Sequence, residues 1–190
     1  MTVPRLLARL TPFLKGRDPH PMTPVIRLSG VIGAGPRGLS LDSLAKPIAQ
    51  AFGMWKASAV VLAISSPGGS PSQSLLIARR IRQLAEEREI PVIAFCEDVA
   101  ASGGYWLACA ADEIYALETS IVGSIGVVSA GFGFDRALDK LGVDRRLHAV
   151  GDRKGMLDPF SPEKAEDVAR LKAIQGGLHD VFRAWVEERR

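Results

Sequence analysis

Continuous apolar runs alternate with amphipathic stretches along the middle of the chain. Residues 58–66 read SAVVLAISS and residues 91–99 read PVIAFCEDV, two runs rich in Val, Ile and other apolar side chains. Runs of this length and composition are typical of strands that are covered on both faces. The segment between them, 71–89, has a Ser/Pro start and apolar positions at helical spacing, namely Leu76, Ile77, Ile81 and Leu84. The order strand, helix, strand predicts a parallel βαβ unit.

The same patterns predict the elements of the rest of the chain. Shorter apolar runs predict strands at 25–32, 113–117, 120–130 and 144–150, the third interrupted by Gly123 and Gly126. Helical patterns predict helices over 39–54, directly after Ser102, over 135–142 with Gly142 as C-cap, and over 161–190 with Pro162 in the first turn. Strands and helices in alternation predict an α/β fold with a mostly parallel sheet.

The net charge of +3 originates in the N-terminal segment. Residues 1–20 carry four basic side chains and one acidic one, whereas the other 170 residues carry 20 of each sign. Because no basic stripe lies outside this segment, we expect no nucleic-acid partner. Residues 1–23 are predicted to form a basic arm and linker, followed by one domain over 24–190.

The arm interleaves its basic residues with Leu6, Leu7, Leu10, Phe13 and Leu14. This pattern fits peripheral contact with an anionic membrane surface, but an arm that is mobile or docked locally is the favoured interpretation. No run of about 18 apolar residues is present, so no spanning helix is expected, and the arm lacks the continuous apolar region of an export signal. Cys96 and Cys109 lie in apolar runs, which is typical of small core residues in a reducing compartment. We expect a cytoplasmic protein, which peripheral contact of the arm would place at the inner face of the membrane.

Gly33, Gly35 and Gly38 have the G-x-G-x-x-G spacing of a dinucleotide-binding turn. That motif also needs an acidic residue about 20 positions later to hold the ribose hydroxyls. No Asp or Glu occurs between Ser43 and Ala85. The segment is therefore interpreted as a glycine-rich loop, without a nucleotide cofactor.

Two predicted strands end in small residues at the point where a helix begins. Gly68 and Gly69 follow the first strand, and Ser102 and Gly103 follow the second. In a parallel sheet the carboxyl ends of the strands form the edge at which ligands bind. Ser102 is open to two interpretations, a helix cap or a nucleophile whose oxyanion is stabilised by the N–H groups of Gly69 and Gly103.

A nucleophilic serine needs a base, and none of the three histidines is well placed for that role. His20 lies in the linker, His148 within a predicted strand and His179 in the terminal helix. Lys154 follows a predicted strand in a Gly-flanked loop that continues into apolar residues. A desolvated lysine can lose its proton and act as the base of a Ser–Lys pair, although a solvated loop lysine is the alternative.

Four segments in order, SPGGS, ASGGYW, IVGSIGVV and DRKGMLDPFSP, resemble the S49 peptidase family, the signal peptide peptidase A group and its relatives. The resemblance runs from Pro24 to Arg190. It implies a Clp/crotonase-like α/β spiral of βαβ units that assembles into homo-oligomers. Members usually continue beyond the long helix, so the domain is expected to be C-terminally incomplete or to be completed by a partner subunit.

The resemblance also implies roles for five residues. Ser102 is the expected nucleophile and Lys154 the general base. Gly69 and Gly103 are the expected oxyanion-hole donors, and Ser124 the hydroxyl that orients the lysine amine. Such a dyad needs no metal and no cofactor. The implied function is a serine endopeptidase that forms an acyl-enzyme with peptide substrates such as residual signal peptides.

Two other functions stay open at this stage. A crotonase-like acyl-CoA enzyme shares the paired-amide oxyanion hole but needs neither Ser102 nor Lys154. A non-catalytic oligomeric scaffold would form defined assemblies without reacting at Ser102. Specificity depends on side chains that folding brings together, so the natural substrate and the oligomer number do not follow from the sequence.

Overall fold

A computed structural model describes residues 21–33, 35 and 38–190 of the chain. It contains two compact units, of which the first ends at Gly123 and the second comprises Ser124–Arg190. Each unit is described by itself. Most of the predicted basic arm, residues 1–20, lies outside the described residues.

The first unit is built on a five-stranded parallel sheet. Its strands are β1 (Val25–Ser29), β2 (Val60–Ser66), β3 (Val92–Ala101), β4 (Glu113–Ala116) and β5 (Ile121–Gly123). They follow the order β1-β2-β3-β4, and β5 pairs with β3 beyond the end of β4. Every pairing is parallel, which confirms the predicted α/β class with a parallel sheet.

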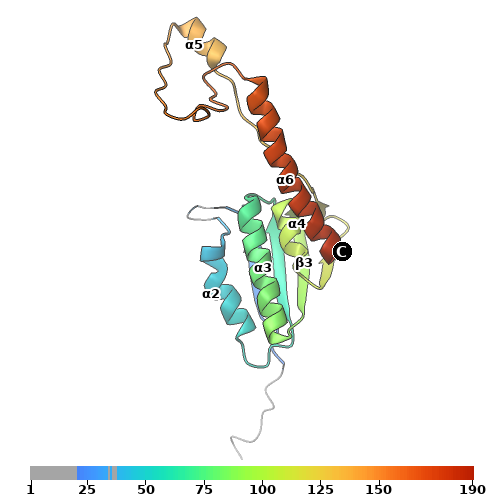
Figure 1. Cartoon of the computed structure of the whole chain (residues 1–190). Coiled ribbons are helices and arrows are strands. Elements are labelled where there is room, and N and C mark those ends of the chain that lie inside the picture. The colour runs from blue at the N-terminus through green and yellow to red at the C-terminus, as the bar shows by residue number, and fades with distance from the viewer. Residues whose placement is uncertain (1–20, 34, 36–37) are drawn as a thin grey trace, which may run out of the picture. The chain divides into compact units, whose positions relative to one another are not determined.

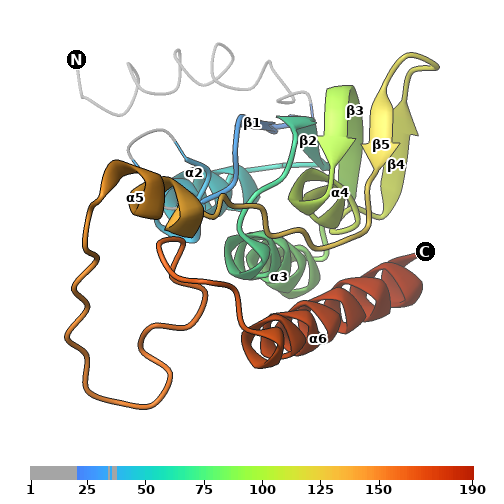
Figure 2. The same ribbon diagram turned by 90° about the horizontal axis from the view of Figure 1, so that it is seen from above.

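Three helices lie on one face of this sheet, as Figures 1 and 2 show: α2 (Leu41–Phe52), α3 (Pro71–Arg88) and α4 (Gly103–Ala108). Their apolar faces and the side chains of β1, β2 and β3 form the core, with Leu28, Ile48, Leu62, Ile64, Ile77, Ile81 and Leu107 fully buried. These elements confirm the strands and helices predicted from the apolar runs at 58–66 and 91–99 and from the amphipathic segment between them.

The opposite face of the sheet keeps large apolar side chains exposed. The register aligns Arg27 with Ala63, Ala63 with Phe95, and Phe95 with Tyr115, so these four share one face. Phe95 and Tyr115 are 45% and 50% exposed and their rings stack at 5.3 Å. Because the strands are parallel and only one face is packed in this unit, the sheet is only half covered.

Both cysteines are buried in the core of the first unit, as predicted. Burial raises the pKa of the Cys96 thiol above its ordinary value, with a smaller contribution from Cys109. A neutral, buried thiol behaves as a small apolar group, which accounts for the place of both residues inside apolar runs.

The second unit contains α5 (Asp135–Leu141), α6 (Ala165–Arg189) and an irregular segment between them. The left-handed Gly142 ends α5, which confirms the predicted C-cap. Phe134 stacks on Phe160 at 5.6 Å, and its N–H donates to the Pro159 carbonyl at 2.6 Å. These contacts join the start of α5 to the segment that precedes α6.

Three predictions for this part of the chain are wrong in extent or kind. No strand forms over 144–150, where every residue is exposed, because its apolar positions pair with no neighbouring strand. The predicted strand at 120–130 is limited to β5, since the positive φ of Gly123 and Ser124 ends the extended backbone. Pro162 precedes α6 instead of starting it, because Ser161 is held in a turn by its backbone hydrogen bond to Asp158.

Within the described part of the chain, no helix combines the length and the apolar character required to cross a bilayer.

Candidate active site

Ser102 occupies the sharp junction between β3 and α4. Its φ of 52° and ψ of −118° lie in a region that L-residues rarely adopt. The backbone fixes this conformation, because the Ser102 N–H donates to the Gly123 carbonyl at 2.7 Å and its own carbonyl accepts from Trp106 at 3.0 Å. The side chain makes no capping hydrogen bond to α4. The hydroxyl therefore does not serve as a helix cap, which was one of its two interpretations.

Gly103 and Gly104 allow α4 to start directly against the neighbouring strand. A Cβ at Gly104 would collide with the Ser66 carbonyl at the end of β2. A Cβ at Gly103 would collide with the Ser74 hydroxyl and lie 3.1 Å from the Ile32 side chain. Close packing thus requires glycine at both positions, and the absence of side chains there also leaves space beside Ser102.

Gly68 and Gly69 form a second tight turn, after β2, with φ values of 99° and 146°. The turn is tied to Ile32 on both sides, since Ile32 N–H donates to the Gly68 carbonyl and Ser70 N–H donates to the Ile32 carbonyl, both at 2.8 Å. A Cβ at Gly69 would collide with that same Ile32 carbonyl. In this parallel bridge the N–H of Gly69 points away from Ile32 and takes no part in the pairing.

The two turns meet at Ser102. A Cβ at Gly68 would lie 2.7 Å from the Gly103 nitrogen and 2.8 Å from the Ser102 Cβ. Among the described residues, neither the Gly69 N–H nor the Gly103 N–H donates a backbone hydrogen bond. A hydroxyl beside two uncommitted N–H groups is the arrangement that stabilises the oxyanion of acyl transfer. Three of the five predicted site residues, Ser102, Gly69 and Gly103, therefore come together in the first unit.

Ile32, Ser66 and Ser74 contact these turns, but no pattern in the sequence predicts a role for them. Ile32 had only the weak signal of an apolar residue in front of a glycine-rich loop. Ser66 and Ser74 are ordinary small polar residues in the sequence. Their position under the glycines depends on the register between elements, which periodicity does not give.

The other two predicted residues, Ser124 and Lys154, belong to the second unit. Ser124 is exposed and has a φ of 58°. Lys154 is exposed in a run of turns, where its N–H donates to the Gly151 carbonyl at 3.2 Å. Within its own unit the Lys154 side chain is exposed and not in the desolvated surroundings predicted for its amine, and the Ser–Lys pair stays a prediction.

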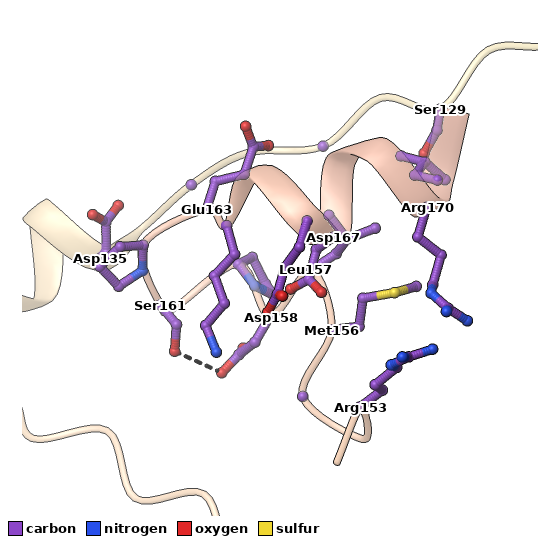
Figure 3. Close-up of a pocket in the computed structure, with 18 of the residues that line it drawn as sticks. Ser129, Asp135, Arg153, Met156, Leu157, Asp158, Ser161, Glu163, Asp167 and Arg170 are labelled. Carbon is purple, nitrogen blue, oxygen red and sulfur yellow. Dashed lines mark hydrogen bonds between the residues drawn. The ribbon is translucent and has the colours of Figure 1, made fainter. Parts of the chain in front are cut away.

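The loop of Lys154 also borders a cavity of about 1000 Å³ in the second unit. Arg153 and Gly155 line it, but Lys154 does not. Figure 3 shows Arg153 and Arg170 on the same side of the cavity as Met156, whereas Ser161 and Asp158 bond to each other further along the wall. Acidic and basic side chains share the lining, so its charge does not favour one class of ligand.

Within the described ranges there is no cluster of three or more His, Cys, Asp or Glu side chains in a metal-binding arrangement.

Comparison with known proteins gives one family and several relatives. The family model described as Peptidase family S49 matches residues 85–190. The chain is 53% identical to a Brucella melitensis protein named Na(+)/H(+) antiporter NhaA. The matching region covers 99% of this chain and 26% of that protein. The chain is also 36% identical to the chloroplastic serine protease SPPA of Arabidopsis thaliana, over a region that covers 75% of this chain and 21% of that protein. A solved structure of a mutant of the membrane-bound stomatin-specific protease 1510-N shares 22% identity and a TM-score of 0.43, over 59% of this chain and 50% of that one.

Proposed function

The chain belongs to peptidase family S49, and we propose that it hydrolyses peptide bonds as a serine-type peptidase with Ser102 as the nucleophile. The observation that carries this proposal is the strained Ser102 beside the two uncommitted N–H groups of Gly69 and Gly103. The chain spans 26% and 21% of the two curated relatives described above, so the activity is proposed for the domain and not transferred from them.

The reaction follows from the positions of these groups. The Ser102 oxygen attacks the carbonyl carbon of the scissile bond and loses its proton to a base. The Gly69 and Gly103 N–H groups donate to the oxygen that becomes negative, aided by the positive N-terminal end of α4. The tetrahedral intermediate collapses as the leaving amine takes up the proton, and an acyl-enzyme remains on Ser102. Water, deprotonated by the same base, then releases the second product.

Lys154 is the proposed base, with Ser124 as the hydroxyl that orients its amine. A neutral amine can accept the serine proton, and the Ser–Lys pair is a known variant of the Ser-His-Asp triad. Support for Ser124 comes from the chain itself, because Ser124 follows Gly123, whose carbonyl accepts the Ser102 N–H. For Lys154, the support is family membership, since the residue lies within the range that the family model matches.

Peptides such as residual signal peptides are the proposed substrates, and a homo-oligomer is the proposed assembly. Exposed apolar side chains in both units favour association, among them Val25, Phe132 and Val150 at 61%, 81% and 95% exposed. We also propose a cytoplasmic location beside the membrane. The similarity to part of a protein named as an antiporter supports this location, as does the basic and apolar composition of residues 1–20.

A serine-reactive fluorophosphonate tests the nucleophile directly. We expect the reagent to attach to Ser102 of the wild type, with the adduct located by peptide mass spectrometry, and not to the Ser102→Ala variant. Ser129→Ala, an exposed serine of the second unit, is the control that keeps full labelling. If the reagent attaches to another residue, or does not react with the folded wild type, the result would favour the non-catalytic scaffold. Turnover of a CoA thioester that survives Ser102→Ala would favour the acyl-CoA enzyme.

A further inference from the structure

Two serines beneath the candidate active site have no role in the proposed reaction. In the part of the chain that the structure describes, the buried polar side chains are those of Ser66 and Ser74, each 0% exposed. A buried hydroxyl is costly unless it is hydrogen-bonded, and an alanine would fill the same space without that requirement. Both hydroxyls are bonded, and both bonds go to the backbone that flanks Gly69.

Ser66 holds the residue before Gly69. As the last residue of β2, its side chain accepts a hydrogen bond from the Gly68 N–H at 3.2 Å. Its own carbonyl lies against Gly104, at the position where a Cβ would collide. One residue therefore contacts both turns, the one that carries Gly69 and the one that carries Gly103.

Ser74 holds the residue after Gly69. It lies in the first turn of α3, where its hydroxyl donates to the Ser70 carbonyl at 2.9 Å and its N–H donates to the same oxygen at 3.0 Å. Ser70 in turn donates its N–H to Ile32. The Ser74 oxygen also lies against Gly103, where a Cβ would collide with it.

We propose that Ser74 and Ser66 are positioning residues that set the spacing and direction of the Gly69 and Gly103 N–H groups. The peptide units on both sides of Gly69 are hydrogen-bonded to Ile32, and the next unit on each side is hydrogen-bonded to Ser66 or Ser74. Gly103 is packed against the Ser74 oxygen. This inference rests on the proposed function for its catalytic meaning, since an oxyanion hole requires both donors to point at one oxygen.

The test compares Ser74→Thr and Ser74→Ala with a matched control, Ser43→Ala. Thr adds a methyl group to a fully buried side chain that lies against Gly103, whereas Ala removes the hydrogen bond and keeps the packing. Ser43 likewise donates from the first turn of a helix to the carbonyl of the N-cap residue, Ser40, at 3.0 Å, but its side chain is exposed on α2. Ser74→Ala and Ser43→Ala thus both remove a hydrogen bond from a side chain to the N-cap carbonyl of a helix, but only Ser74 lies against Gly103.

The first measurement is made on the full, ¹⁵N-labelled chain before any reaction with the fluorophosphonate, and needs no activity. We expect the amide ¹H–¹⁵N resonances of Gly69 and Gly103 to shift in both Ser74 variants and to stay in place in Ser43→Ala. Unchanged resonances in Ser74→Thr would overturn the positioning role. If the resonances shift but the wild type never reacts at Ser102, the proposed function is wrong and the positioning role stands.

The second measurement is the rate of fluorophosphonate labelling of Ser102 and, with a peptide substrate, the division between kcat and KM. Misaligned donors stabilise the transition state less but leave substrate binding in the ground state unchanged. We therefore expect kcat to fall while KM is unchanged. We expect a loss of roughly 10- to 100-fold in Ser74→Thr, a smaller loss in Ser74→Ala, and wild-type rates in Ser43→Ala. Equal rates in Ser74→Thr and the wild type would contradict the inference.

Discussion

Ser102 is a residue whose backbone conformation is unfavourable by itself. A non-glycine residue in a rarely populated φ/ψ region costs about 1–3 kcal/mol and persists only where its surroundings fix it. Here the Gly123 carbonyl, the Trp106 N–H and the close approach of Gly68 supply that constraint. The conformation turns the side chain away from the helix end, so the hydroxyl is not consumed as a cap.

Ser102→Gly should therefore stabilise the fold while removing the nucleophile. Glycine adopts a φ of 52° without steric cost, so we expect the free energy of unfolding to rise by about 1 kcal/mol relative to Ser102→Ala. Urea unfolding of the two variants measures the difference, with Ala as the control for loss of the hydroxyl alone. A Gly variant less stable than the Ala variant would show that the turn is not strained.

At the scale of elements, the first unit repeats one arrangement. A buried parallel strand ends in two small residues, and a helix begins against the neighbouring strand, once at Gly68–Gly69 before α3 and once at Ser102–Gly103 before α4. The glycines permit this closeness, since a side chain at any of Gly68, Gly69 and Gly103 would meet the other turn, Ile32 or Ser74. Packing thus brings two helix starts, and two free amides, to one edge of the sheet.

Gly104→Ala tests how tightly α4 packs on β2. The added methyl group would collide with the Ser66 carbonyl, so we expect a loss of about 1–3 kcal/mol in the free energy of unfolding. Gly177→Ala in α6 is the matched control, since a Cβ there meets nothing within 4 Å and alanine favours helix. Denaturant titration of both variants checks the contrast. Two variants with equal stability would contradict the packing argument.

The sequence predicted the elements of the first unit well because their signals are local. The apolar run of β2 and the helical spacing of α3 each suffice to identify the element. The second unit was predicted less well. Its segment at 144–150 has apolar residues at Leu147 and Val150, but both are exposed and no strand forms. A strand exists only where a partner strand is available, and periodicity does not report that.

At the scale of the whole molecule, the proposed dyad joins groups from both units. Ser102 belongs to the first unit and Lys154 to the second, and both lie within the residues that match the family model. Gly69 lies before that match, so its assignment depends on the ordered motifs and on the geometry around Ser102. The order of motifs predicted a set of site residues through the family resemblance. It could not give the contacts of Ser66, Ser74 and Ile32, because these arise from the register between strands and helices.

The Ser–Lys claim is tested most directly by the rate at which the fluorophosphonate labels Ser102 across a pH series. The wild type and Lys154→Ala are compared, with Lys164→Ala as the control for loss of an exposed lysine in the same unit. We predict that labelling of the wild type and of Lys164→Ala rises with pH as the catalytic amine loses its proton. Lys154→Ala should be slower by about 10²-fold or more and should lose this rise. A Lys154→Ala variant that labels at the wild-type rate at every pH would contradict the account.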